Sequence, residues 1–283
     1  MIEARVPAMS EVIDPRAEVL SVVSGMGSLN VIWCNRIGTL SFVDTASHAV
    51  YRYVMGRHQT KPNEGALGID RLDAIGAFGL PIDYQGRLLT SYRSTGQVTR
   101  VDVDGVERDI GASGVGAPSD LVYAIDGSIY IADLPESGAA GAVVQYTRGG
   151  ETRVAASTCP CPSGVTLDTR QLHLLVADQQ LNAVYRFPIT ADGGLEPPSV
   201  VIEGPAGSVS GLGPLKTDDT GHLYIASSAG LLVYTPDGLH LGTVVLPESP
   251  VNLCWGRGFT SLYLSTRTSI FFVPTKVRGT RTF

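Results

Sequence analysis

The sequence predicts an all-β protein, and within that class a six-bladed β-propeller. The first observation is a hairpin-like segment, Gly211–Gly238, in which two short apolar runs flank a small-residue corner and end in a Pro-Asp-Gly turn. The second is that such segments recur about every 40 to 50 residues, the spacing of propeller blades. A hairpin this short cannot bury its own apolar faces, whereas a ring of stacked sheets buries them without long open edges.

Six copies of this segment follow one another along the chain. They are Thr39–Val54, Gly86–Gly105, Gly127–Gly150, Gln171–Phe187, Gly211–Gly238 and Ser261–Val273. An apolar stretch upstream of each copy, such as Leu121–Tyr123, would supply the inner strand of a blade. The apolar segment Ala17–Gly25 precedes the first complete copy, and we expect it to pair with the last blade and close the ring. Residues 1–16 are then an extension, and residues 17–283 a single domain.

Composition limits the classes of partner. The chain has 283 residues, of which 43% are hydrophobic, so it can bury one large core. A net charge of −6 and the lack of a long basic run argue against nucleic acid and anionic membranes as partners. The N-terminal stretch lacks the apolar centre of a signal peptide, and no apolar run has the length of a spanning helix. These features predict a soluble, cytoplasmic protein.

Two cysteines form a Cys-Pro-Cys sequence at Cys159 and Cys161. Zinc sites usually combine two such pairs, or one pair with histidines at a fixed spacing. Neither partner is present near this pair, so we interpret it as an incidental loop pair, with a redox role as the alternative.

Alignment of the six copies gives two columns of residues at strand ends, about 14 to 15 positions apart. Strand ends gathered round one axis form a natural funnel for a small ligand. The first column, at the start of the inner strands, holds Leu29, Phe78, Ser119, Ser163, Gly213 and Asn252. The second, which closes the next strand, holds Asp44, Tyr92, Asp133, Asp178, Ser227 and Thr266.

At these positions the chain resembles the SMP-30/gluconolactonase/regucalcin family of six-bladed propellers. The segments that carry the resemblance are Ser119–Pro135, Pro162–Phe187, Leu215–Gly238, Leu246–Asn252 and Lys276–Gly279. The resemblance implies lactonase activity and a divalent metal, usually calcium or zinc, held by Glu, Asn and Asp side chains in the funnel. In this sequence the family's Glu falls on Leu29, its Asn positions fall on Phe78, Ser119 and Ser163, and its Asp falls on Gly213.

These replacements remove every charge from the implied metal site. Calcium needs six or more oxygen ligands, several of them anionic, and zinc needs three or four nitrogen, sulfur or carboxylate ligands. We therefore predict that the protein has no metal and no cofactor. Water activation that depends on the family's metal should be lost as well.

Four residues are candidate catalytic groups. Asp133 and Asp178 could act as general acid or base, although carboxylates at such positions often bind turn backbones instead. Tyr92 could donate to an oxyanion, and Arg93 could grip a carboxylate or polarise a carbonyl. A guanidinium exposed at the rim is the alternative for Arg93.

Ten further residues are candidate substrate contacts, because the two columns or their immediate neighbours contain them. They are Leu29, Asn30, Asp44, Phe78, Ser119, Asp120, Ser163, Ser227, Asn252 and Thr266.

Three functions fit this pattern. The first is a metal-independent enzyme that holds a fairly apolar organic substrate in the funnel for cyclisation, isomerisation or elimination. The second is a lactone hydrolase, and the third is a non-catalytic binder of a ligand or protein. A small-molecule substrate is the expected partner, and the sequence leaves the oligomeric state open.

Overall fold

The computed structural model describes residues 1–34, 39–54, 65–71, 77–79, 83, 85, 87–102, 104–134, 139–204 and 211–280. In these residues the strands form six antiparallel sheets, and helix is limited to a few short turns. The chain divides into two compact units with three sheets each: unit 1 (Met1–Ile75 and Leu215–Thr280) and unit 2 (Gly76–Pro214 with Arg281–Phe283). The predicted class, an all-β six-bladed propeller, is confirmed, whereas the expectation of a single domain stays a prediction.

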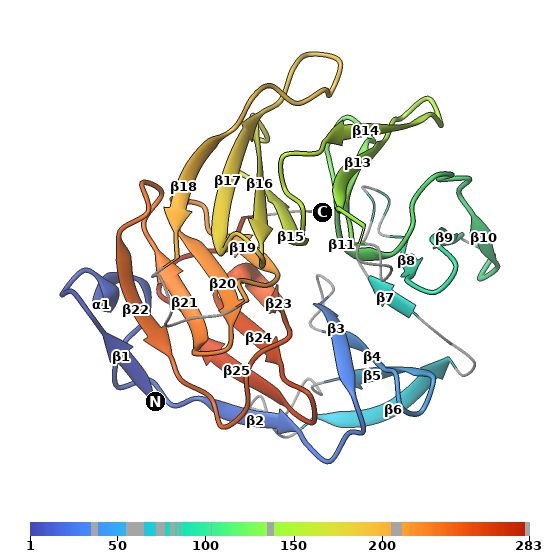
Figure 1. Ribbon diagram of the computed structural model, residues 1–283. Coiled ribbons are helices and arrows are strands. Elements are labelled where there is room, and N and C mark those ends of the chain that lie inside the picture. The colour runs from blue at the N-terminus through green and yellow to red at the C-terminus, as the bar shows by residue number, and fades with distance from the viewer. Residues whose placement is uncertain are drawn as a thin grey trace. The chain divides into compact units, whose positions relative to one another are not determined.

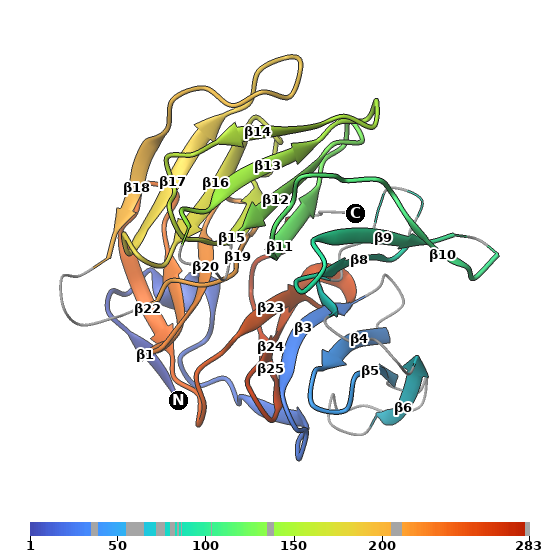
Figure 2. The same ribbon diagram turned by 45° about the vertical axis from the view of Figure 1, so that its right-hand side comes forward.

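Unit 2 contains three blades, each a four-stranded meander. They are β7 (Ala77–Gly79), β8 (Leu89–Tyr92), β9 (Gln97–Val101) and β10 (Glu107–Asp109); β11 (Pro118–Tyr123), β12 (Ile129–Asp133), β13 (Ala142–Tyr146) and β14 (Thr152–Ala156); and β15 (Pro162–Leu167), β16 (His173–Asp178), β17 (Ala183–Pro188) and β18 (Ser199–Glu203). The inner strands β7, β11 and β15 contact one another in that order, and Figure 2 shows the β11–β14 sheet stacked on the β15–β18 sheet.

Unit 1 contains the other three blades, two of which include a strand from the N-terminal segment. They are β3 (Leu29–Cys34), β4 (Thr39–Asp44), β5 (Ala49–Val54) and β6 (Ala66–Arg71); β19 (Leu215–Thr217), β20 (Leu223–Ser227), β21 (Gly230–Tyr234) and β22 (His240–Val244) with β1 (Ile2–Ala4); and β23 (Asn252–Trp255), β24 (Ser261–Ser265) and β25 (Ile270–Pro274) with β2 (Leu20–Val23). A short 3-10 turn, η2 (Arg257–Phe259), precedes β24.

Burial explains where the apolar runs lie within each blade sequence. The central strands β12, β20 and β24 are buried at every residue, so both of their faces are covered. The outermost strand β14 covers nothing on its outer side, and Val154 on it is 66% exposed. The apolar runs of the sequence therefore mark the middle of each blade.

The last blade is completed as predicted by an N-terminal strand. Leu20 on β2 pairs with Phe272 on β25 in an antiparallel ladder, so β2 is the outer strand of the sheet β2-β25-β24-β23 (Figure 1).

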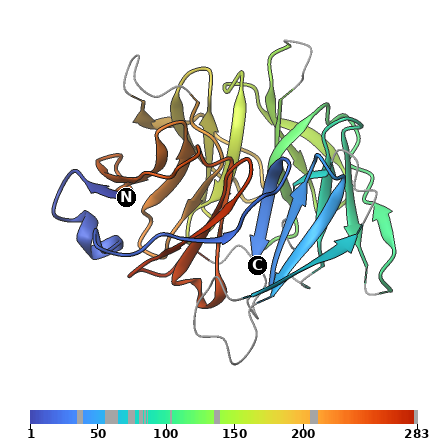
Figure 3. The same ribbon diagram turned by 90° about the horizontal axis from the view of Figure 1, so that it is seen from below.

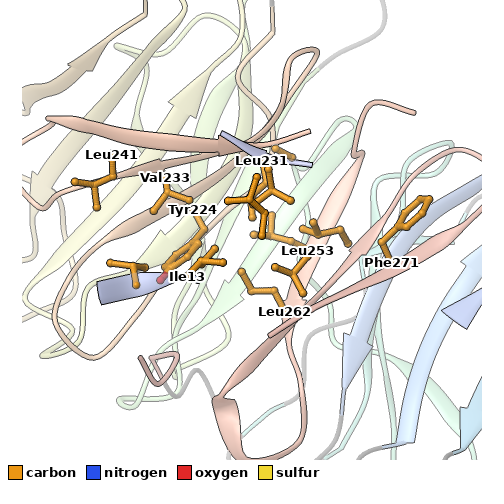
Figure 4. Packing of buried hydrophobic residues seen from close by; sticks show 14 of the residues in the cluster. Ile13, Tyr224, Leu231, Val233, Leu241, Leu253, Leu262 and Phe271 are labelled. Carbon is orange, nitrogen blue, oxygen red and sulfur yellow. The ribbon is translucent and has the colours of Figure 1, made fainter. Parts of the chain in front are cut away.

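Residues 1–16 are more than an extension. β1 pairs with β22 as a fifth strand, and helix α1 (Met9–Val12) follows it against the same blade (Figure 3). Met9 and Ile13 are fully buried in a cluster with Tyr224, Leu231 and other side chains of the last two blades (Figure 4). None of the helices among the described residues has the length and apolarity to span a bilayer.

Candidate functional site

The first column of predicted site residues coincides with a repeated irregularity in the inner strands. In the β11–β12 ladder Pro118 pairs with Asp133 and Asp120 with Ala132, which leaves Ser119 as an extra, unpaired residue. The β15–β16 ladder has the same bulge at Ser163. A bulge re-aims the side chain it carries.

The β3 and β7 strands repeat the bulge. In β7 it falls on Phe78, whose side chain lies outside the described part of the structure. In β3 it begins after Leu29, which pairs directly with Asp44, so Asn30 takes the place equivalent to Ser119. The sequence alignment was therefore one residue out in this blade. Leu29 packs in a core cluster with Val22 and Ile270, while Asn30 is half-buried.

The serines at these bulges join neighbouring blades. Ser119 Oγ lies 3.0 Å from Ala132 O in its own blade and 2.9 Å from Pro162 O in the next. Ser163 Oγ lies 3.2 Å from Ala177 O and 2.5 Å from Leu212 O. A hydroxyl has one proton, and here that proton is directed at backbone carbonyls. Both serines thus serve as inter-blade links.

Asp120 links the same two blades from the next position. Its carboxylate is 7% exposed and accepts one bond from Leu121 N and one, of 3.0 Å, from Val165 N on the inner strand of the neighbouring blade. In unit 1 the amide oxygen of Asn252 accepts from Leu253 N at 2.7 Å. Gly213, at the equivalent position before β19, packs its carbonyl against Gly164.

The three aspartates of the second column clamp the backbone that leads into each inner strand. Asp44 accepts N–H bonds from Gly27 at 3.2 Å, Ser28 at 2.7 Å and Ala46 at 3.1 Å. Burial raises the pKa of Asp44, but these bonds outweigh it and hold the pKa below its usual range.

Asp133 and Asp178 make equivalent bonds. Asp133 accepts from the amides of Gly116 and Ala117, the second at 2.6 Å. Asp178, which is fully buried, accepts from Cys161 N at 2.8 Å, Gln180 N at 2.9 Å and Leu181 N at 2.8 Å. Asp133 and Asp178 therefore bind backbone N–H groups, as in the alternative to a general acid or base role.

Ser227 and Thr266 also bind backbone groups at the ends of their strands, each through one hydroxyl. Ser227 Oγ donates to Gly230 O and accepts from Ala229 N, and Thr266 Oγ1 donates to Ser269 O and accepts from Ser269 N. Their hydroxyls hold the following turns in place.

Tyr92 and Arg93 depart from this pattern. The Tyr92 hydroxyl donates to Glu107 Oε1 at 2.7 Å, on the outermost strand of its blade. The half-buried Arg93 extends to the neighbouring blade, where Nη2 lies 3.5 Å from Leu134 O, just beyond the end of β12. Arg93 is thus the only cation among the four predicted catalytic residues, and its guanidinium lies at the strand ends.

A second set of aspartates, at the opposite ends of the strands, was not singled out from the sequence. Each follows an inner strand, caps the turn, and binds the side chain that opens the next strand; the four pairs are Asp83–Arg87, Asp126–Ser128, Asp168–His173 and Asp218–His222. The signal was an Asp that recurs two to five residues before an Arg, Ser or His and an apolar run.

The Cys-Pro-Cys loop packs into the core rather than into a reactive site. Cys159 is fully buried among apolar side chains, and this burial raises the pKa of its thiol to about 12. A thiol that stays protonated is a poor nucleophile and a poor metal ligand. The half-buried Cys161 donates its backbone N–H to Asp178, and the structure gives no support to the redox alternative.

Comparison with known proteins decides the family. A family model described as SMP-30/Gluconolactonase/LRE-like region matches residues 28–268. The chain belongs to the SMP-30/gluconolactonase/LRE-like family. Solved structures similar to the chain include a candidate gluconolactonase (TM-score 0.85, 21% identity, 99% of this chain and 100% of that chain) and a gluconolactonase of Xanthomonas campestris (0.82, 20%, 97% and 94%).

A third similar structure is regucalcin, a calcium-binding protein of Agrobacterium tumefaciens (TM-score 0.75, 14% identity, 92% of this chain and 95% of that chain). At these identities the likeness is one of fold. A search of curated protein sequences gives no significant match.

The residues present do not fit the metal that the family resemblance implies. Asn30, which takes the place of the core residue Leu29 in the first column, is neutral, the Ser119 and Ser163 hydroxyls are bonded to carbonyls, and Asn252 offers a neutral amide already bonded to its own backbone. The described residues include no group of three or more His, Cys, Asp or Glu side chains that could hold an ion. Within that part of the chain, the donor set lacks the anionic oxygens that calcium requires.

Proposed function

We propose that the protein hydrolyses a small lactone without a divalent metal. Membership of the SMP-30/gluconolactonase/LRE-like family over residues 28–268 carries the proposal, and likeness to a gluconolactonase over 97% of the chain supports it. The poor fit of the strand-end residues to a metal ion supports the second half of the proposal.

Arg93 is the group that we assign to the reacting ester. Water attack on a lactone carbonyl places negative charge on the carbonyl oxygen, and a guanidinium aimed at that oxygen stabilises it. After the ring opens, the same guanidinium can hold the product carboxylate with two parallel hydrogen bonds. The backbone clamps Asp133 and Asp178 would keep the strand ends rigid around this reaction.

Metal removal tests this function directly. We expect the EDTA-treated protein to hydrolyse members of a panel of γ- and δ-lactones, measured by acid release with a pH indicator, and added calcium or zinc to leave the rate unchanged. Arg93→Ala should lower kcat/KM roughly 100-fold, the usual loss for one oxyanion donor. The control is Arg170→Ala, an exposed arginine in a turn of unit 2. Activity that disappears with EDTA and returns with calcium would contradict the proposal.

The metal-independent cyclase, isomerase or lyase remains a second candidate. It is favoured by the apolar and neutral character of the residues in the first column, which suits an uncharged organic substrate. A protein that converts such a substrate but no lactone in the panel would support this candidate instead.

A further inference from the structure

A cavity lies in unit 2, between the β7–β10 and β11–β14 blades. Its volume is about 570 Å³, well within the range of small-molecule sites. Its walls include Asp83 and Arg87 from one blade and the turn from Ile125 to Gly127 from the other. These residues follow the inner strands, so the cavity is at the opposite end of the strands from Ser119.

The floor of this cavity is apolar and belongs to the blade core. Leu89, Tyr123 and Ile129 are at least 93% buried, and they pack together in one cluster with Ile110 and Tyr146 at its edge. The Tyr146 hydroxyl donates to Ile110 O at 2.6 Å, which fixes its ring against the wall. The floor is thus a rigid apolar surface that suits the C–H face of a ligand.

The walls carry three guanidinium groups, two of which are held in place. Arg87 donates through Nε to Asp83 Oδ2 at 2.7 Å and through Nη1 to Asp102 at 3.2 Å. Asp83 is 2% exposed, so this pair is built into the fold. Arg100 donates through Nε to Asp102 at 2.7 Å. Each arginine keeps N–H groups beyond those used here, because a guanidinium has five.

The third guanidinium and two carboxylates complete the walls. Arg148 is exposed and forms no ion pair with any carboxylate of the described residues. Asp109 accepts from Gln97 and Gly111, and Asp126 accepts twice from Ser128. These carboxylates keep lone pairs for a ligand, since each oxygen can accept more than one bond.

The charges around the cavity nearly cancel, which selects against ions. Three arginines line it together with three aspartates, so an anion would meet Asp109 and Asp126 and a cation would meet the guanidiniums. A neutral molecule rich in hydroxyl groups avoids both penalties. Each hydroxyl can accept from an arginine and donate to an aspartate, while the carbon skeleton covers the apolar floor.

We propose that this cavity is a binding site for a neutral, polyhydroxylated molecule of sugar size. The site is separate from the strand ends that hold Arg93, and the proposal does not depend on the lactonase assignment.

Ligand-observed NMR on the full chain tests the proposal, with glucose and maltose as neutral probes, gluconate as the anionic probe and glucosamine as the cationic probe. We expect saturation transfer to the neutral probes in the natural protein. Ile125→Trp should abolish it, because residue 125 is 70% exposed at the cavity wall and a larger side chain there fills the space. The matched control is Val154→Trp, 66% exposed on the outer strand β14, which should bind normally.

Arg148→Ala gives a second readout that leaves the cavity open. Loss of one hydrogen bond to a charged group should weaken binding of the neutral probes about tenfold. The proposal is overturned if the neutral probes show no transfer, if Ile125→Trp binds them as the control does, or if gluconate or glucosamine binds more tightly than glucose. Lactone hydrolysis is measured separately. Absence of sugar binding would therefore not contradict the proposed lactonase function, and absence of lactone hydrolysis would not contradict this binding site.

Discussion

Asp178 illustrates how one residue type serves two ends of the same blade. At the strand ends near Ser163, Asp178 accepts backbone N–H groups, and at the opposite ends of the same blade Asp168 binds the side chain of His173. In both places the carboxylate replaces water as the partner of turn amides that would otherwise be buried without a bond.

Replacement of Asp178 should lower the stability of the protein rather than act directly on the reaction. Asp178→Ala leaves three amides without an acceptor, and we expect a loss of roughly 3 kcal/mol in the free energy of unfolding. Asp178→Asn keeps an acceptor oxygen and should lose less. Urea denaturation measures both losses. If Asp178→Asn remains folded yet loses lactone hydrolysis, Asp178 has the catalytic role that the sequence first indicated.

His222 couples stability to pH through its bond with Asp218. The bond, with Nδ1 and Oδ2 2.8 Å apart, raises the pKa of His222 above its ordinary 6.5, and Glu11 adds to the effect. Burial raises the pKa of Asp218, but its bonds from His222 and Thr220 outweigh burial and lower it. The folded protein therefore binds more protons at His222 than the unfolded chain does, above pH 6.5.

The stabilisation from His222 is complete below pH 6.5 and is lost as the pH rises through the higher value of the folded state. The contribution of Asp218 is present above its ordinary pKa and is lost as the pH falls through its lowered value. Melting temperatures measured from pH 5 to 9 should fall at the alkaline side, and His222→Gln should remove most of that slope. An unchanged slope in the variant would assign it to other groups.

At the scale of elements, the N-terminal segment contributes to two blades of unit 1. β2 completes the last sheet, while β1 and α1 cover the outer strand of the sheet before it. The apolar segment ahead of the first complete copy, together with the need to close the ring, was enough to predict β2. Residues 1–16 were read as an extension because α1 spans only four residues, too few to show helical periodicity.

Substitution of Ile13 tests whether residues 1–16 pack against the core of unit 1. The Ile13 side chain is fully buried in the cluster that includes Tyr224 and Leu253, so Ile13→Ala should lower the free energy of unfolding by about 2 to 5 kcal/mol. Arg16→Ala, at a side chain that is 92% exposed, should change it by less than about 0.5 kcal/mol. Thermal unfolding compares the two. Equal stability of both variants would show that α1 does not pack as described.

The sequence predicted the blades better than it predicted the site. Repeats reveal strands because the 2-residue alternation is local, and the columns of strand-end residues followed from that spacing. The bulges could not be predicted in this way, because one extra residue in a ladder does not change the apolar pattern of the sequence. For this reason Leu29 was assigned to the position that Asn30 occupies in the structure. The partners of Ser119 and Asp133, and Cys161 among the partners of Asp178, are backbone groups 13 or more residues away, so no local side-chain pattern predicts these bonds.

At the scale of the whole molecule, metal should leave stability unchanged. A ligand that binds only the folded state stabilises it by RT ln(1 + [L]/Kd) and so raises the melting temperature. We expect neither calcium nor EDTA to shift the melting temperature, measured by differential scanning calorimetry, and elemental analysis of protein purified without chelator to give no stoichiometric metal. A calcium-dependent rise would show that ligands for an ion do exist in the chain.

The pairing of β2 with β25 also has a consequence for biosynthesis. Leu20 leaves the ribosome long before Phe272, its partner in the ladder, has been translated. During that interval residues 20–23 lack their ladder partner, and an unpaired strand edge can pair with another chain. Completion of the last blade must then wait for release of β25, and because the paired strands are distant in sequence we expect this blade to form late when the full-length chain refolds.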